Sequence, residues 1–390
     1  MNSISLHTPL VPVRSPLSHI DCQLNRTASK TGSLWNRFLN WMGEFLRDAF
    51  FLPIPANPSP AIQKGLKREE DFVAAFWNAG KATDLNYPYQ EKIREIFTVN
   101  DQPIKMRTTD GKLLQITCRI IEPKIKSNAK SYNFVHVLGN ISTISNNIDT
   151  PYSYLAAYLE QKEKDPTLSP ARFVLISQYD MQVDGAPFKP RSLDEAGLIL
   201  KKTLDTLYET YGEIDHLVAH SLGSIIFASA LKHFEGDTKA FPQNIHFDRA
   251  PSSIEVASKT HSGGTILHFL AKLSGWSVDI GKELGDFYLK NPKIPCIVSG
   301  VKYDFYFPGP ASLHEHNKIK EINQVKVLIF DPPHQLFHMR AHHGLRADLL
   351  NGHYLVDHSD RQFLREKEHL ASASMRHTFQ KLKVSQLRSA

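Results

Sequence analysis

The chain has 390 residues, enough for one large domain or two modest ones. With 41% hydrophobic and 22% charged residues, it has the composition of a globular protein, which excludes an intrinsically disordered chain. The formal net charge of +6 comes from scattered basic residues that form no nucleic-acid footprint, so we expect no nucleic acid among its partners.

The cysteine content and the N-terminal sequence indicate where in or outside the cell the protein is expected. Cys22, Cys118 and Cys296 are odd in number and widely spaced, which predicts neither a disulfide framework nor a zinc cluster. The first residues lack a charged start followed by an apolar run, and no stretch of about 18 apolar residues occurs. We therefore expect no transmembrane segment, and a protein that is cytoplasmic or exported without a cleaved signal peptide.

The first hundred residues differ from the rest. Residues 1–30 are rich in Ser, Thr, Pro and Asn and predict a flexible arm. Residues 31–100 predict a helical extension: a helix from Ser33 with a Trp35–Phe51 apolar spacing, a proline-rich connector, and mixed helical character over 66–98. Its aromatic and charged residues make peripheral membrane contact through 33–52 one interpretation and packing on its own domain the other.

Residues 101–390 predict one α/β domain. Strands at Ile104–Thr108 and Leu113–Ile121 are joined across Asp110-Gly111, a strong hairpin signal. Ser192 and Glu195 form a capping box that opens a helix ending at Gly212. Helices then alternate with short apolar runs, which predicts a mostly parallel sheet with helices on both faces; those runs are Phe134–Leu138, Phe173–Ser177, Ile214–Val218, Ile245–Phe247, Pro295–Ser299 and Val325–Phe330. A last helix is expected from about Asp360.

The most informative motif is Ala219-His-Ser221-Leu-Gly223, which follows an apolar strand and precedes a helix rich in small and apolar residues. A serine at such a strand–turn–helix junction is the pattern of a nucleophile elbow. The turn is tight, so the residues two before and two after the serine must be small. Backbone N–H groups at the start of the helix can stabilise negative charge there.

On these residues the chain resembles the α/β-hydrolase superfamily of lipase- and esterase-like serine hydrolases, over about residues 101–370. The resemblance implies the α/β-hydrolase fold with a lid or cap, which would fall at 252–292. It also implies the order nucleophile, acid, histidine. Gly300 through Pro308 looks like the family's acid loop and puts Asp304 on the acid position. Asp248 is the alternate acid, with a salt bridge to Arg249 as its other interpretation.

The histidine is chosen among several. Gly352-His353 resembles the family's glycine–histidine turn and makes His353 the preferred base, with residues 331–350 as an insertion. His334 lies closer to the end of the last strand and is the alternate base. The N–H groups of Leu222 and Asn140, the latter in the turn after Gly139, are expected to form the oxyanion hole.

These residues predict a serine hydrolase that cleaves carboxylic esters, with a small-molecule or lipid acyl ester as substrate and no cofactor. An acyltransferase with the same triad, and a catalytically silent hydrolase fold that binds partners or membranes, are the alternatives. Histidines at 334–343 suggest a metal hydrolase only weakly, because no H-E-x-x-H or comparable spacing accompanies them.

Overall fold

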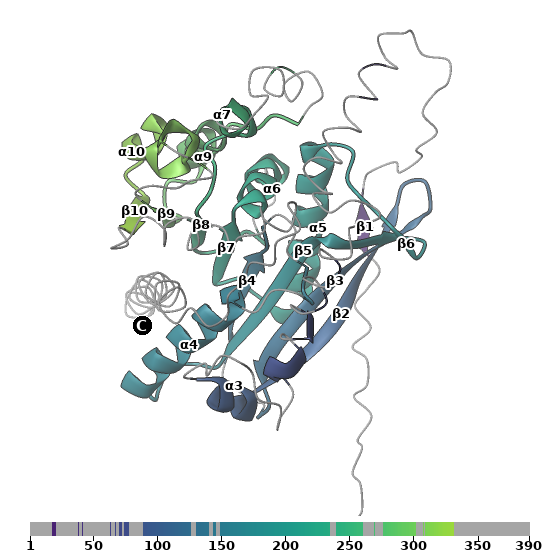
Figure 1. Ribbon diagram of the computed structural model, residues 1–390, viewed down its shortest axis with the longest axis vertical. Helices are drawn as coiled ribbons and strands as arrows, with labels where there is room; N and C mark the ends of the chain where they lie inside the picture. The colour runs from purple at the N-terminus through teal and green to yellow at the C-terminus, as the bar shows by residue number, and fades with distance from the viewer. Residues whose placement is uncertain are drawn as a thin grey trace, which may run out of the picture.

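The computed structural model describes residues 18–20, 38, 41, 63, 67, 70–71, 74–77, 89–125, 130–139, 143–145, 149–234, 239–259, 269, 276–301, 307 and 309–330. In this part of the chain ten strands form one sheet in the order β1-β2-β3-β5-β4-β7-β8-β9-β10, with β6 paired to β5. Figure 1 shows the sheet running from β1 and β2 at one edge to β10 at the other.

The sheet is mostly parallel. β5, β4, β7, β8, β9 and β10 run in the same direction, whereas β3 is antiparallel to both β2 and β5. The strands are β1 (Ser18–Ile20), β2 (Phe97–Thr108), β3 (Leu113–Pro123), β4 (Tyr132–Val137), β5 (Ala171–Val183), β6 (Ala186–Pro187), β7 (His216–His220), β8 (Ile245–Asp248), β9 (Cys296–Val301) and β10 (Val325–Phe330). The expected fold class, a mostly parallel sheet with helices, is confirmed.

Helices and turns connect the strands. The α-helices are α3 (Gln90–Ile96), α4 (Asp149–Lys164), α5 (Leu193–Tyr211), α6 (Leu222–Ala230), α7 (Ile254–Lys259), α9 (Ile280–Lys290) and α10 (Asn317–Glu321), and the 3₁₀ turns are η1 (Leu231–Phe234), η2 (Gly309–Ala311) and η3 (Leu313–Glu315). In the described part of the chain no helix is both long and apolar enough to cross a bilayer.

Local sequence signals account for several boundaries. Ser192 caps α5, where its hydroxyl accepts a hydrogen bond from the Glu195 N–H at 3.1 Å. Gly212 ends that helix with a φ of 84°, a conformation that glycine adopts without strain. Asp110 and Gly111 lie in the hairpin between β2 and β3, as the sequence predicts.

Tertiary pairing changes other boundaries. The helical character expected over 66–98 stops at Ile96, because the chain from Phe97 onward pairs with β3 over eleven positions. Within the first 30 residues, where a flexible arm is expected, Ser18–Ile20 forms β1 and pairs in parallel with β2. β2 would otherwise expose its backbone donors and acceptors along that stretch.

Two apolar cores lie on opposite faces of the sheet. The face that α5, α6 and α9 cover takes alternate strand residues; its members include Val135, Val137, Leu200, Leu204, Leu217, Ala219, Ile225, Phe247, Leu284 and Val298. The face that α3 and α4 cover is rich in aromatic rings; its members include Phe97, Phe134, Tyr152, Tyr154, Tyr158 and Phe173. Helices therefore cover both faces, as expected.

The segment 252–292, expected to be a lid, contributes to the core at both of its ends. Ile254 in α7, the fully buried Trp276, and Ile280 in α9 belong to the core on the α5–α6 face. Residues 260–268 and 270–275 lie outside the described residues. Any lid is therefore limited to the middle of the segment, because the apolar residues at its ends pack into the fold.

His136 lies in the middle of the α3–α4 core. Its ring is 1% exposed and packs edge-on against Tyr154, with 4.6 Å between the ring centroids. Neither ring nitrogen has a hydrogen-bond partner in the described structure. Burial lowers the pKa of His136 to about 3. The folded protein therefore keeps this imidazole neutral, while the unfolded chain takes up a proton below about pH 6.5.

This difference predicts acid sensitivity. As pH falls from 6.5 toward 3, the unfolded state binds a proton that the folded state excludes, so His136 lowers the free energy of unfolding by about 2 kcal/mol at pH 5. His136→Phe keeps a ring in the same place and removes both unpaired nitrogens. We expect its urea-unfolding free energy to fall less than that of wild type between pH 7.5 and pH 5. Superimposable pH profiles for the two proteins would contradict the prediction.

Candidate active site

Ser221 occupies the turn between β7 and α6, near the middle of the sheet. Its backbone has φ 51° and ψ −120°, a region that residues with a side chain rarely adopt. Such a conformation costs about 1–3 kcal/mol and persists only where surrounding contacts enforce it. Here the Ser221 N–H donates to the Asp248 carbonyl at 3.1 Å, and the Ser221 carbonyl accepts from the Ser224 N–H at 3.0 Å.

Gly223 and Gly139, on either side of the serine, are glycines because neighbouring atoms leave little room for a side chain. An added Cβ on Gly223 would lie 2.5 Å from the carbonyl oxygen of Val137 and 2.7 Å from that of Leu138. An added Cβ on Gly139 would lie 3.0 Å from both Ser221 Cβ and His220 Cδ2. The first turn of α6 therefore packs directly against the end of β4, and Gly139 lies against the serine.

Leu222 is the first residue of α6, so its N–H is one of the donors that a helix start leaves without an intrahelical partner. The positive end of the helix dipole lies at the same place. Asn140, the second expected donor of the oxyanion hole, falls outside the described residues. A developing negative charge near Ser221 would therefore lie beside the start of α6.

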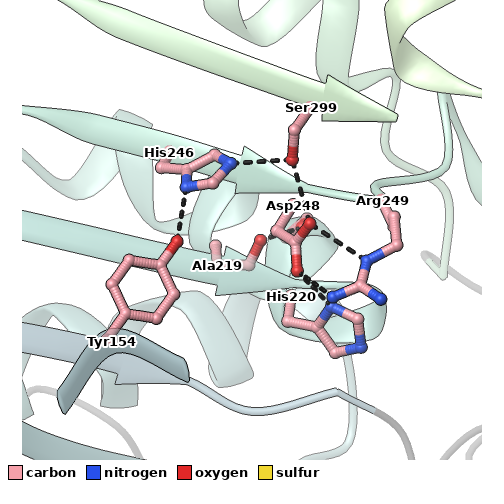
Figure 2. A network of polar contacts seen from close by, with 8 residues as sticks. Tyr154, Ala219, His220, His246, Asp248, Arg249 and Ser299 are labelled. Carbon is pink, nitrogen blue, oxygen red and sulfur yellow. Dashed lines mark hydrogen bonds and ion pairs between the residues drawn. The ribbon is translucent and has the colours of Figure 1, made fainter. Parts of the chain in front are cut away.

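Buried polar side chains meet around Asp248 (Figure 2), whose main-chain carbonyl accepts the Ser221 N–H. His220 Nδ1 lies 3.0 Å from Asp248 Oδ2, and Ser299 Oγ donates to Asp248 Oδ1 at 2.9 Å. The Arg249 guanidinium bonds both carboxylate oxygens through Nε, at 3.0 Å, and Nη2. Burial alone would raise the pKa of Asp248, but Arg249 and His220 hold it well below its usual range. The carboxylate is therefore ionised and accepts at least four hydrogen bonds.

The same network continues across the α3–α4 face. His246 Nε2 lies 2.7 Å from Ser299 Oγ, and the Tyr154 hydroxyl lies 2.7 Å from His246 Nδ1. Burial lowers the pKa of His246 to about 4, so its ring is neutral at physiological pH. We call Tyr154, His246, Ser299, Asp248, His220 and Arg249 the Asp248 network. Its members come from α4 and from the ends of three neighbouring strands.

The network bears on the alternate acid. The ion pair between Asp248 and Arg249, which the sequence suggests as the other interpretation, is present. The carboxylate oxygens of Asp248 already bond His220, Ser299 and Arg249. A catalytic histidine from the C-terminal segment would have to share these oxygens with them. Asp248 stays an alternative to Asp304 and not the preferred acid.

The remaining predicted site residues, Asp304, His334 and His353, lie outside the described residues. The strands that precede them are described: β9 ends at Val301 and β10 at Phe330. Both run parallel to β7 through β8, so their carboxyl ends lie at the same edge of the sheet as Ser221. The described chain thus reaches the same edge as Ser221 three residues before Asp304 and four before His334.

The sequence pattern does not single out His220, His246, Ser299 and Tyr154 as members of one network. A signal was present, since His246 and Ser299 are polar residues inside short apolar strands. It does not show which polar residues meet, because that depends on the order of the strands in the sheet.

Gly223 offers a direct test of the close packing behind this turn. In Gly223→Ala the new methyl meets two backbone carbonyls that cannot move without shifting β4, so we expect a loss of about 1–3 kcal/mol in the free energy of unfolding. The matched control is Gly285→Ala in α9, where nothing lies within 4 Å of the added methyl and helix propensity favours alanine by about 1 kcal/mol. Urea unfolding of both variants measures the difference; equal effects would contradict the packing described here.

No protein-family model and no curated protein sequence matches this chain. Solved structures resemble it loosely. An acylaminoacyl peptidase from Pyrococcus horikoshii is 17% identical with a TM-score of 0.46, covering 75% of this chain, which spans only 43% of that protein. An esterase from Pyrobaculum calidifontis is 11% identical with a TM-score of 0.39, and the match covers 86% of this chain and 98% of the esterase. Brefeldin A esterase, described as a bacterial homologue of human hormone-sensitive lipase, is 14% identical with a TM-score of 0.38 and coverages of 87% and 93%.

At these TM-scores the likenesses establish no activity for this chain, and the activities named belong to those proteins. The sheet itself is the firmer observation. Its parallel strands have helices on both faces, and a serine sits at a strained turn between a central strand and the start of a helix. This chain has the α/β-hydrolase fold.

Proposed function

We propose that this protein is a serine hydrolase that cleaves carboxylic esters through an acyl-enzyme formed on Ser221. The observation that supports the proposal most is the strained backbone of Ser221 at the N-terminus of α6. A positive φ at a residue with a side chain is expensive, and such strain clusters at functional sites. Contact with Gly139 on one side and the helix start on the other support an oxyanion site next to the serine.

The mechanism assigns one role to each site residue. Ser221 Oγ attacks the ester carbonyl, while His353, or His334 in its place, accepts the hydroxyl proton and later gives it to the leaving alcohol. Asp304 holds the imidazole in the correct tautomer. The N–H groups of Leu222 and Asn140 stabilise the oxyanion, and water then hydrolyses the acyl-enzyme.

Acyl or lipid esters are the substrate class we favour. The middle of the 252–292 segment includes Phe269, whose side chain is 60% exposed. An exposed aromatic side chain in that segment would suit contact with an acyl chain. An alcohol in place of water as acceptor would make the protein an acyltransferase, which analysis of products in the presence of added alcohols distinguishes.

An activated serine predicts covalent labelling. We expect a fluorophosphonate probe to label the folded wild-type protein and to leave Ser221→Ala unlabelled, since only a serine with a base and an oxyanion site reacts at a useful rate. Ser224→Ala is the control, because that hydroxyl donates to the Ala219 carbonyl and is not the proposed nucleophile. A folded wild type that resists labelling would favour the catalytically silent scaffold instead.

Single substitutions identify which histidine is the base and which aspartate is the acid. On p-nitrophenyl esters of increasing chain length, His353→Ala should lower kcat by about 10³-fold or more, and His334→Ala should have little effect. The opposite ranking would make His334 the base. In the same assay Asp304→Asn should lower kcat strongly, and an unchanged kcat would make Asp248 the acid; thermal unfolding confirms that the variant folds.

Peripheral membrane contact through 33–52 is a further part of the proposal. Phe38 and Trp41, which are described, are 43% and 59% exposed, and their rings stack with centroids 6.1 Å apart. Exposed aromatic rings of this kind insert at the boundary between lipid headgroups and acyl chains.

We expect the double variant Phe38→Ser with Trp41→Ser to pellet with anionic liposomes at least about tenfold less than wild type. This variant is sharper than deletion of residues 1–60, which would also remove β1 from the sheet. Leu289→Ser, at an exposed apolar residue on α9, is the control. Unchanged pelleting of the double variant would end the membrane proposal.

A further inference from the structure

We propose that His220 is a positioning residue for Ser221, and that the Asp248 network holds its imidazole so that the strained serine turn keeps its reactive geometry. The inference rests on the proposed function of Ser221 and adds to it a residue outside the predicted triad. It starts from the chain of hydrogen bonds that Figure 2 shows.

Donor and acceptor can be assigned for each hydrogen bond in the series that runs from Tyr154 to Asp248. The ionised Asp248 carboxylate can only accept, so Ser299 Oγ gives its single proton to it. Ser299 must then accept from His246, which places the His246 proton on Nε2. Because His246 is neutral, its Nδ1 accepts from the Tyr154 hydroxyl. All donors therefore point toward Asp248.

The same reasoning sets the tautomer of His220. Its Nδ1 lies 3.0 Å from a carboxylate oxygen, so Nδ1 bears the proton and donates to Asp248. The opposite edge of the ring faces the loop after β4, since an added Cβ on Gly139 would lie 3.0 Å from His220 Cδ2 and from Ser221 Cβ. The His220 ring thus lies between the Asp248 carboxylate and Gly139.

Asp248 holds both residues of the His220–Ser221 pair. Its carboxylate bonds the His220 ring, and its main-chain carbonyl accepts the Ser221 N–H at 3.1 Å. The next residue, Arg249, also has a positive φ of 47°, and its N–H donates to the Ser299 carbonyl at 2.9 Å. Each of these two strained residues is therefore held by a main-chain hydrogen bond to the neighbouring strand. Asp248 links the two positions, because its carbonyl holds the Ser221 N–H and its carboxylate holds the His220 ring.

Stability alone does not account for this arrangement. A buried ion pair with its hydrogen bonds typically stabilises a fold no more than apolar side chains of similar volume would. What a polar network can add is a single geometry, because every donor and acceptor must be satisfied at once. That property matters most where the backbone is strained and the position of one hydroxyl decides the rate.

The test compares three substitutions of His220. Asparagine places an amide N–H where His220 has Nδ1 and can still donate to Asp248, whereas glutamine places it near the position of Nε2 and leucine has no donor. We expect His220→Asn to react with a fluorophosphonate within about threefold of the wild-type rate, and His220→Gln and His220→Leu to react about ten- to a hundredfold more slowly. Thermal unfolding of the asparagine and glutamine variants should be similar, which separates positioning from a general loss of stability.

A pH profile separates positioning from direct proton transfer. If His220 only positions, the midpoint of the labelling rate against pH is the same in wild type and His220→Asn. A midpoint shifted by more than about one pH unit would identify His220 as the base and overturn the inference. Equal slowing of the asparagine and leucine variants, or no slowing of either the glutamine or the leucine variant, would overturn it as well.

Ser299→Ala is the second variant, for the case in which the His220 variants do not fold. It removes one donor to Asp248 and leaves His220 in place, and we expect labelling to slow about three- to tenfold. An unchanged rate would contradict the inference. If folded wild-type protein is not labelled, the proposed function fails and this inference fails with it; if wild type is labelled and the variants do not follow the order above, only the inference fails.

Discussion

The close packing of α6 against the end of β4 is the constraint on which the rest of the site depends. Because Gly223 has no side chain, the first turn of the helix lies in contact with the carbonyls of Val137 and Leu138. The chain leaving β7 must then turn sharply, and Ser221 takes the positive φ that this turn requires. The serine, the helix start and the loop after β4 are brought together by one contact.

A second constraint acts from the side of β8. Asp248 accepts the Ser221 N–H through its backbone and bonds His220 through its carboxylate, while Arg249 balances its charge inside the protein. Removing one charge of the Asp248–Arg249 pair would leave the other charge buried without its counter-ion, which is more costly than losing an exposed ion pair. The polar network and the strained turn therefore depend on each other, and both lie at the carboxyl edge of the parallel strands.

That edge also explains how distant parts of the sequence can share one reaction. Parallel strands place their carboxyl ends side by side, so the ends of β7, β8 and β9 are neighbours although they are far apart along the chain. The predicted acid and base follow β9 and β10 within a few residues of their ends, or after a longer connection in the case of His353. The proposed chemistry takes place at this edge, and the Asp248 network fixes the positions of the side chains next to it.

The sequence by itself determined the features set by short-range geometry: the capped start of α5 at Ser192, the hairpin at Asp110-Gly111, and the serine turn between Ala219 and Gly223. These depend on a few adjacent residues and the conformations they allow. Only the tertiary structure decided that Trp276 packs in the core and that His220 joins the Asp248 network. Such contacts depend on strand order and on which face each residue presents, and residues far apart in the chain give no local sign of either.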